Sequence, residues 1–482
     1  MTHADYIKLI NFLNIFSFPS LKLINTLLVC TLLNSCAYIS YNEKKIVIND
    51  LNESIKSIDI YDTEFNDYLI KKGFKEQNLP FKEWGLNELL LAQNFFNYDL
   101  KNAKKEWLLI QSNEDLALLA PASSVGVEVG QGDSGDEISK NIFGGGFTFT
   151  IETANKKLIR YEIAFNETQS ALLNYELKIW ESRITLLKNI TDYIENQDLI
   201  KITKDELKLK QSIIHMLKKR IELGVSSQVE LERIKLELGS INNSLISFQF
   251  KQAQQIKKIA LSLGMSQEKF NLIPINVSKI KELINAATIV FLDNQTIGEL
   301  KSKTMISNKT LRVMLANYAI KESKLKYEIA KQYPDFNFSP AYFYDQGNNI
   351  WSIGIDSVLN ASKKNKLLIE KSKKIRSLEA GKVKKYQLSL INDSELLLFN
   401  FHNHLKTLKN SQRILEDKNN LKKQLQNRFD QGILGRLELE LEIIKLNQID
   451  KDYHKALYNL LRSGLDAEMI MQRPIFTNKL PI

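Results

Sequence analysis

Two long stretches of this sequence contain no proline, and this feature restricts the fold more than any other. After Pro121 the next proline is Pro274, and after Pro340 the next is Pro474. Proline breaks the interior of a helix, so uninterrupted stretches of this kind are free to form very long helices. The sequence therefore predicts two long helical segments.

Apolar side chains in both stretches recur with the spacing of a helix face. From Ile163 to Ile194, and again from Leu405 to Phe429, many follow one another at intervals of three to four residues. A pattern sustained well beyond ~25 residues is typical of a coiled coil or a helical repeat. At about 1.5 Å per residue, some 65 helical residues would extend on the order of 100 Å.

The two halves of the chain match each other at a constant offset. Gly354 lies 208 positions after Gly146, and Gly432 lies 208 positions after Gly224. Gly224 and Gly432 each follow an Arg-initiated segment and precede a Glu-rich one, which predicts a glycine turn between two helices. Each half then reads helix, strand, loop, strand, long helix, turn, long helix.

Two segments alternate apolar and polar residues as strands do. One face is apolar and rich in aromatic residues, and we predict that it contacts lipid: Val125, Val127, Val129, Phe147, Phe149, Phe336, Phe338, Tyr342, Tyr344, Trp351 and Ile353. The other face is small, polar or charged, with Phe343 as the exception. Polar connections are expected over residues 131–141 and 346–349. This alternation fits transmembrane strands, although hairpins packed on a soluble core would give the same pattern.

Four strands are too few to close a barrel, and an open strand edge is not tolerated in lipid. Closure must then come from several chains. Two chains would give eight strands and a filled interior, and three chains would give twelve strands around a lumen. No segment after the N-terminal region has the ~18 apolar residues that a spanning helix needs. If this chain crosses a membrane, we expect it to do so with strands.

The only two cysteines, Cys30 and Cys36, lie near the N-terminus. Residues 21–35 form a short apolar run after a lysine, and the run ends in small and polar residues directly before Cys36. This arrangement resembles the lipobox of bacterial lipoproteins, so lipidation is expected at Cys36. The alternative is a plain signal anchor.

Other classes of function find little support in the sequence. The net charge is +10, but Lys and Glu alternate along helical stretches and no basic cluster with aromatic residues occurs, so no nucleic-acid partner is expected. The run from Gly130 to Gly135 matches G-x-G-x-x-G, but a strand follows it instead of a helix, which excludes a dinucleotide site. We predict no enzyme activity, no metal site and no cofactor.

The ordered set of these features resembles the TolC-like outer-membrane efflux proteins from about Trp84 to Leu465. The resemblance rests on the duplication, the proline opening the outer strand of each half and the two glycine turns. It implies a mainly α fold in which three chains form a twelve-stranded β-barrel continuous with a periplasmic α-barrel. The implied partners are two further copies, outer-membrane lipid, a periplasmic adaptor (membrane fusion) protein and an inner-membrane transporter of RND or ABC type.

The resemblance also implies roles for residues of the two turns. The adaptor would dock on the hairpin tips, Leu223, Gly224, Val225, Gln431, Gly432 and Ile433. The periplasmic aperture would be lined by Glu438 and its first-half counterpart Glu230, with Arg436 as the nearest basic residue. The sequence departs from the family at Leu441, where a second acidic ring can occur. Exposed helix positions beside Lys and Arg would account equally well for both glutamates.

The predicted organisation has eight parts. They are a lipoprotein signal segment (1–36), an N-terminal periplasmic or equatorial region with the first helix (37–120), a first transmembrane hairpin (121–153), a first long helical hairpin (154–273), a linker and helix (274–333), a second transmembrane hairpin (334–360), a second long helical hairpin (361–466) and a C-terminal tail (467–482). The rival interpretation is a lipid-anchored coiled-coil structural or adaptor protein without a pore. A milder alternative keeps the duct but exports secreted polypeptide instead of small toxic compounds.

Overall fold

The computed structural model describes residues 41–56, 58–132, 140–281, 302, 304–345, 348–357 and 362–473. The chain divides into two compact units, Met1–Lys56 and Ser57–Ile482. The described part of the first unit contains helix α3 (Ile48–Lys56). The predicted lipidation site Cys36 lies outside the described residues.

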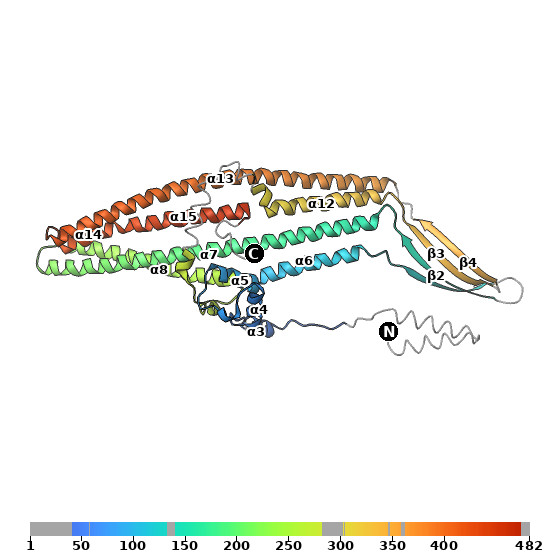
Figure 1. Ribbon diagram of the computed structural model, residues 1–482, viewed down its shortest axis with the longest axis horizontal. Helices are drawn as coiled ribbons and strands as arrows, with labels where there is room; N and C mark the ends of the chain where they lie inside the picture. Colours follow the sequence, from blue (N-terminus) through green and yellow to red (C-terminus); the bar gives the residue numbers. More distant parts are fainter. Residues whose placement is uncertain are drawn as a thin grey trace. The chain divides into compact units, whose positions relative to one another are not determined.

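The second unit contains two similar runs of elements (Figure 1). The first comprises α6 (Tyr98–Ala117), β1 (Ser124–Gly132), β2 (Lys140–Ile151), α7 (Lys156–Glu222) and α8 (Gln228–Leu263). The second comprises α12 (Lys309–Ala330), β3 (Phe336–Asp345), β4 (Asn348–Ser357), α13 (Ser362–Asp430), α14 (Arg436–Lys445) and α15 (Asn447–Met471). The predicted fold class, mainly helical with four strands, is confirmed.

The longest helices follow the proline-free stretches. Helix α7 has 67 residues and α13 has 69. In the second half, the helix after the glycine turn is divided in two at Leu446, whose N–H donates to the carbonyl of Ile443. This i to i−3 bond tightens the helix locally, and the sequence pattern did not predict it.

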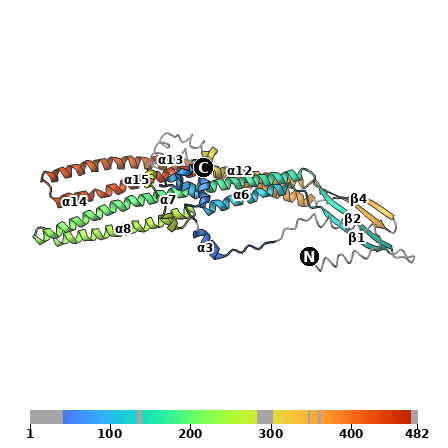
Figure 2. The same cartoon turned by 60° about the horizontal axis from the view of Figure 1, so that its bottom comes forward.

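Helix α7 is the central element of the second unit. It packs against α6 and α12 over the part near the strands, and against α8, α14 and α15 over the part near the turns. Helix α13 packs against α12 and α15 (Figure 2). The two ends of these long helices are therefore covered by different neighbours.

The main hydrophobic core lies where the middle of α7 meets the short helices of the N-terminal region. These are α4 (Thr63–Lys71), α5 (Leu86–Phe96) and α9 (Gln267–Phe270), beside the 3-10 helix η1 (Glu76–Asn78). Leu86, Leu89 and Leu187 are fully or almost fully buried there, as are Leu263 of α8 and Leu460 of α15. Burial of this apolar surface stabilises the packing of both halves of the repeat against one shared core.

The strands form one antiparallel sheet in the order β1-β2-β3-β4. Strands β2 and β3 pair across the two halves of the repeat, with Phe149 opposite Phe338. The predicted loop over 131–141 included residues that belong to strands, because Gln131 pairs with Asn141 and Gly132 with Lys140. Likewise Asn348 and Asn349 belong to β4 and not to a turn. Strand pairing uses backbone groups, so polar residues and glycines can extend a strand.

Among the described residues, no helix is both long enough and apolar enough to cross a membrane.

Candidate functional site: the sheet and the two hairpin tips

One face of the sheet is apolar and exposed. The register places every residue of the predicted lipid-facing set on this face. Val127 is 79% exposed and Trp351 is 81% exposed, whereas large apolar side chains in a water-soluble protein are mostly covered. A contiguous exposed apolar face of this kind marks a surface that contacts protein or lipid.

Aromatic residues on this face are paired across neighbouring strands. Near the connections between strands, Phe143 stacks on Tyr344 with ring centroids 4.9 Å apart, and Tyr342 lies 4.8 Å from Trp351. Near the helices, Phe149 and Phe338 are 5.2 Å apart. Aromatic residues thus lie toward both ends of the apolar face, as they do in the girdles of transmembrane strands.

The opposite face is polar near the helices. Thr148 and Ser339 share a hydrogen bond of 2.9 Å, and Thr150 donates to Asn337 Oδ1 at 2.8 Å. The Asn337 side chain in turn donates to Asp356 Oδ2. This face therefore carries two groups of hydrogen-bonded polar side chains near the helices, a surface suited to water.

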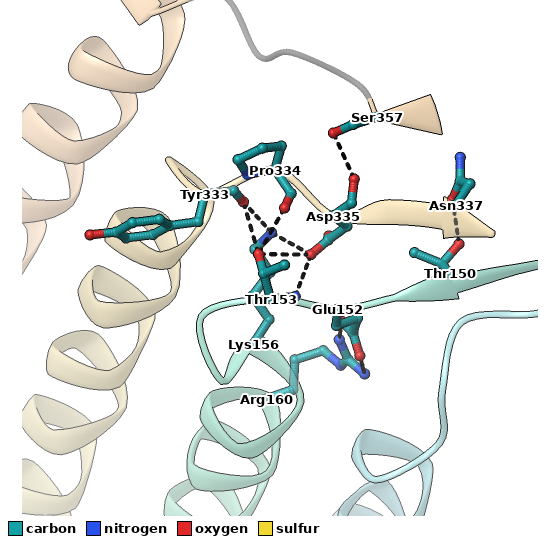
Figure 3. A network of polar contacts seen from close by, with 10 residues as sticks. All are labelled: Thr150, Glu152, Thr153, Lys156, Arg160, Tyr333, Pro334, Asp335, Asn337 and Ser357. Carbon is teal, nitrogen blue, oxygen red and sulfur yellow. Dashed lines mark hydrogen bonds and ion pairs between the residues drawn. The ribbon is translucent and has the colours of Figure 1, made fainter. Parts of the chain in front are cut away.

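A polar junction joins the strands to the helices (Figure 3). The buried Lys156 Nζ donates to Asp335 Oδ1 at 2.7 Å and to the carbonyl of Tyr333 at 2.6 Å. Thr153 donates through its N–H to Asp335 Oδ1 and through its hydroxyl to the carbonyl of Pro334. The segment leaving β2 is thereby fixed to the segment entering β3.

The junction also holds the outer strands. Ser357, the last residue of β4, donates to the carbonyl of Asp335 at 2.8 Å. Arg160 of α7 pairs with Glu152 and donates to the carbonyl of Leu119, in the segment between α6 and β1. These side chains therefore hold the segments before β1 and β3, the segment after β2 and the last residue of β4, which makes the junction a rigid coupling between the two parts.

The two helical turns have the same backbone structure. In the first, the N–H of Gly224 donates to Ile221 and that of Val225 to Arg220. In the second, Gly432 donates to Phe429 and Ile433 to Arg428. Both are Schellman motifs, and both glycines have a φ of 72°. The left-handed conformation explains why glycine recurs at this position of the repeat.

Glu438 is paired with an arginine of the other hairpin. Arg220 Nη1 lies 2.8 Å from Glu438 Oε1, and the two side chains are 40% and 42% exposed. This hydrogen bond holds the pKa of Glu438 below its usual range. A Cβ at Gly435 would lie 2.1 Å from Glu438 Oε2, so the missing side chain at this helix start leaves room for the carboxylate.

The other two expected aperture residues have separate partners. Arg436 pairs with Glu440 in the same helix, with Nε and Oε1 2.6 Å apart, and its guanidinium lies over the Phe429 ring. Glu230 accepts a hydrogen bond from the Ser226 hydroxyl at 3.1 Å. The structure therefore brings Glu438 together with Arg220 and not with Arg436.

The hairpin tips combine a small core with exposed apolar ends. Ile213, Leu217, Leu231 and Ile234 are buried with Leu437, which joins α7, α8 and α14. Beyond this core, the sequence-predicted docking residues are all exposed, with Leu223 at 76%, Val225 at 68% and Ile433 at 63%.

Helix α15 is held against α7 by a charged cluster further from the tips. Arg462 pairs with Asp192 and Glu195, and the Tyr458 hydroxyl donates to Asp198 Oδ2 at 2.6 Å. Burial, together with this bond to Asp198, raises the pKa of Tyr458. These contacts fix the second hairpin at its base, so the Arg220–Glu438 pair is the polar link nearest to the tips.

No family model matches the sequence, and no curated protein matches it either. Solved structures do match. The outer-membrane channel OprN has a TM-score of 0.65 at 13% identity, covering 81% of this chain and 91% of that one. The outer membrane protein VceC from Vibrio cholerae has a TM-score of 0.65 at 11% identity, covering 80% and 95%.

The chain has the TolC-like fold. The CmeC outer membrane channel of Campylobacter jejuni shows it too, with a TM-score of 0.63 at 11% identity over 90% of this chain and 93% of that one. The resemblance read from the sequence is thus confirmed at the level of the fold. Sequence reasoning missed Arg220 as the partner of Glu438, although Arg220 begins the Arg-initiated segment before Gly224. It also missed the junction around Lys156.

Proposed function

We propose that this chain is one subunit of a passive outer-membrane duct that carries small toxic compounds out of the periplasm as part of an efflux system. The observation that carries the proposal is the sheet. It has an exposed apolar face with aromatic residues toward both ends, a polar opposite face, and a rigid connection to helices on the order of 100 Å long. Lipid outside and water inside would satisfy both faces.

Three copies would close the duct. Strands β1 and β4 are the edges of the sheet, and each has a neighbour on one side only. In lipid these edges require pairing, which β1 of one copy and β4 of the next would supply. Large apolar residues on the helices also lack a cover in the single chain, including Leu236, Phe250, Leu378 and Phe399, each at least 63% exposed. Neighbouring copies would bury them.

The hairpin tips are the proposed site of contact with a periplasmic adaptor protein. Leu223, Val225 and Ile433 present exposed apolar side chains on rigid turns, a combination that suits a protein interface. An inner-membrane transporter of RND or ABC type would supply the energy. Because the duct is passive, that transporter would set the cargo.

The aperture is proposed to lie at the same tips. In a trimer, three Glu438 carboxylates would surround the opening, and each would be held by Arg220. A ring of carboxylates favours cations over anions. Acylation of Cys36 would anchor each subunit to the inner leaflet of the outer membrane and leave the duct itself unchanged.

The first experiment is the detergent-corrected mass of the protein extracted from separated outer membranes. A trimer that conducts ions in a planar lipid bilayer is the expected result. A monomer or dimer, or a protein found only in the inner membrane, would refute the duct. The coiled-coil adaptor without a pore would then replace it.

A further inference from the structure

The polar face of the sheet changes character toward the connections between strands. The pairing register aligns Glu128, Gly144, Phe343 and Ile350 in one row across all four strands. In the next row, Ile142 lies opposite Asp345. An aromatic and two aliphatic side chains thus interrupt a face that is otherwise small or polar.

Phe343 is the exception among the aromatic residues of the described strands. The others lie on the apolar face, where lipid contact would account for them, but Phe343 lies on the polar face. Its ring is seated on a glycine. A Cβ at Gly144 would be 2.2 Å from Phe343 Cδ1 and 2.7 Å from Cε1. The missing side chain at position 144 therefore provides the space that the ring occupies.

The neighbours of this ring combine apolar surface with negative charge. Ile350 lies directly opposite Phe343 and is 43% exposed. Glu128 is exposed on the other side of Gly144 in the same row. An aromatic ring, an aliphatic side chain and a carboxylate on one surface suit an apolar organic cation, which the ring attracts through its π face and the carboxylate through its charge.

We propose that Phe343, Ile350 and Glu128 form a binding ring for apolar organic cations near the outer end of the duct. The proposal rests on the three-copy duct above, in which the row occurs three times around one lumen. The ring narrows the exit and retains such cations briefly as they leave. It is separate from the aperture at the hairpin tips, which lies at the opposite end of the long helices (Figure 1).

The test uses the purified full-length trimer in a planar lipid bilayer, with tetraphenylphosphonium as the probe. Tetraphenylphosphonium added on the side of the strand connections should block the wild-type current in a concentration-dependent way. In Phe343→Ala the blocking constant should rise by about tenfold, the loss expected for a partly desolvated cation–π contact. Phe338→Ala, a change of the same residue type on the apolar face of the same strand, is the matched control and should leave the block unchanged.

Two further variants distinguish binding by the aromatic ring of Phe343 from an effect of this side chain on packing. Phe343→Leu keeps apolar volume but removes the aromatic face, and it should weaken the block nearly as much as Phe343→Ala. Gly144→Ala places a methyl group where the aromatic ring of Phe343 lies, so that this side chain must move. The blocking constant of tetraphenylphosphonium should then differ from that of the wild type, while the protein remains a trimer.

The outcomes distinguish the two proposals. If all Phe343 variants form conducting channels and bind the probe as the wild type does, the proposed binding ring is refuted but the proposed duct is not. Phe343 would then only fill the space over Gly144. A wild-type trimer that passes no current would refute both the proposed duct and the proposed binding ring.

Discussion

In the proposed duct, removal of the Arg220–Glu438 pair should shift the equilibrium from a closed toward an open state. The pair links the two hairpins close to their tips, and the nitrogen–oxygen distance is 2.8 Å. Both side chains are about two-fifths exposed, so solvent screens the attraction, and one such pair contributes roughly 0.2–1 kcal/mol. Three pairs in a trimer would contribute roughly 0.6–3 kcal/mol, a factor of about 3 to 150 in the equilibrium between closed and open states.

Single-channel recording of Arg220→Ala in a planar lipid bilayer measures this shift as the fraction of time spent open. The matched control is Arg428→Ala, which changes the equivalent arginine of the second turn, an exposed side chain. The exchanged pair Arg220→Glu with Glu438→Arg should restore the closed state. Equal open fractions in wild type and Arg220→Ala would show that the pair does not hold the aperture.

The same pair predicts a pH dependence. Because Arg220 lowers the pKa of Glu438, in the proposed duct the pair would stabilise closed tips at pH values above the ordinary carboxyl pKa range. This contribution is lost as the pH falls through the lowered pKa and the carboxylate takes up a proton. Acid should therefore open the wild type, and in Arg220→Ala the titration of Glu438 should move to higher pH. An acid response unchanged in Glu438→Gln would assign it to other groups.

Three further changes test the turns, the junction and the apolar face. Gly224→Ala forces an alanine into the left-handed conformation and should destabilise the tip by about 1–2 kcal/mol, measured by hydrogen exchange. The control Gly239→Ala, within α8, should stabilise its helix, and equal effects of the two changes would contradict the turn argument. Lys156→Met leaves Asp335 without its cation and should lower the stability of the trimer by about 1.5–3 kcal/mol. The control is Lys157→Met at an exposed position, and equal losses of stability in the two variants would contradict a structural role for the junction. Ile353→Arg should cost about 2–4 kcal/mol if it lies near the bilayer midplane, measured as folding yield into lipid vesicles, and an unchanged yield would place this face in water.

The sequence by itself determined the elements and their order. The absence of proline permitted α7 and α13, and the glycines at 224 and 432 located both turns, because each position requires a backbone conformation that other residues adopt only at a cost. The alternation of residues assigned the strand faces for the same kind of local reason, since a strand has a period of two. Strand ends were less accurate, because polar residues and glycines pair through the backbone as well as apolar residues do.

Only the tertiary structure decided which residues from the two halves meet. Arg220 and Glu438 are 218 positions apart, and no local pattern distinguishes Arg220 from Arg436 as the partner of the glutamate. The same holds for Lys156 with Asp335 and for the seat of Phe343 on Gly144. Such contacts depend on how far each helix has rotated and on the register in which β2 meets β3. These quantities are fixed by the packing of the whole unit around its core, and the local sequence carries no signal for them.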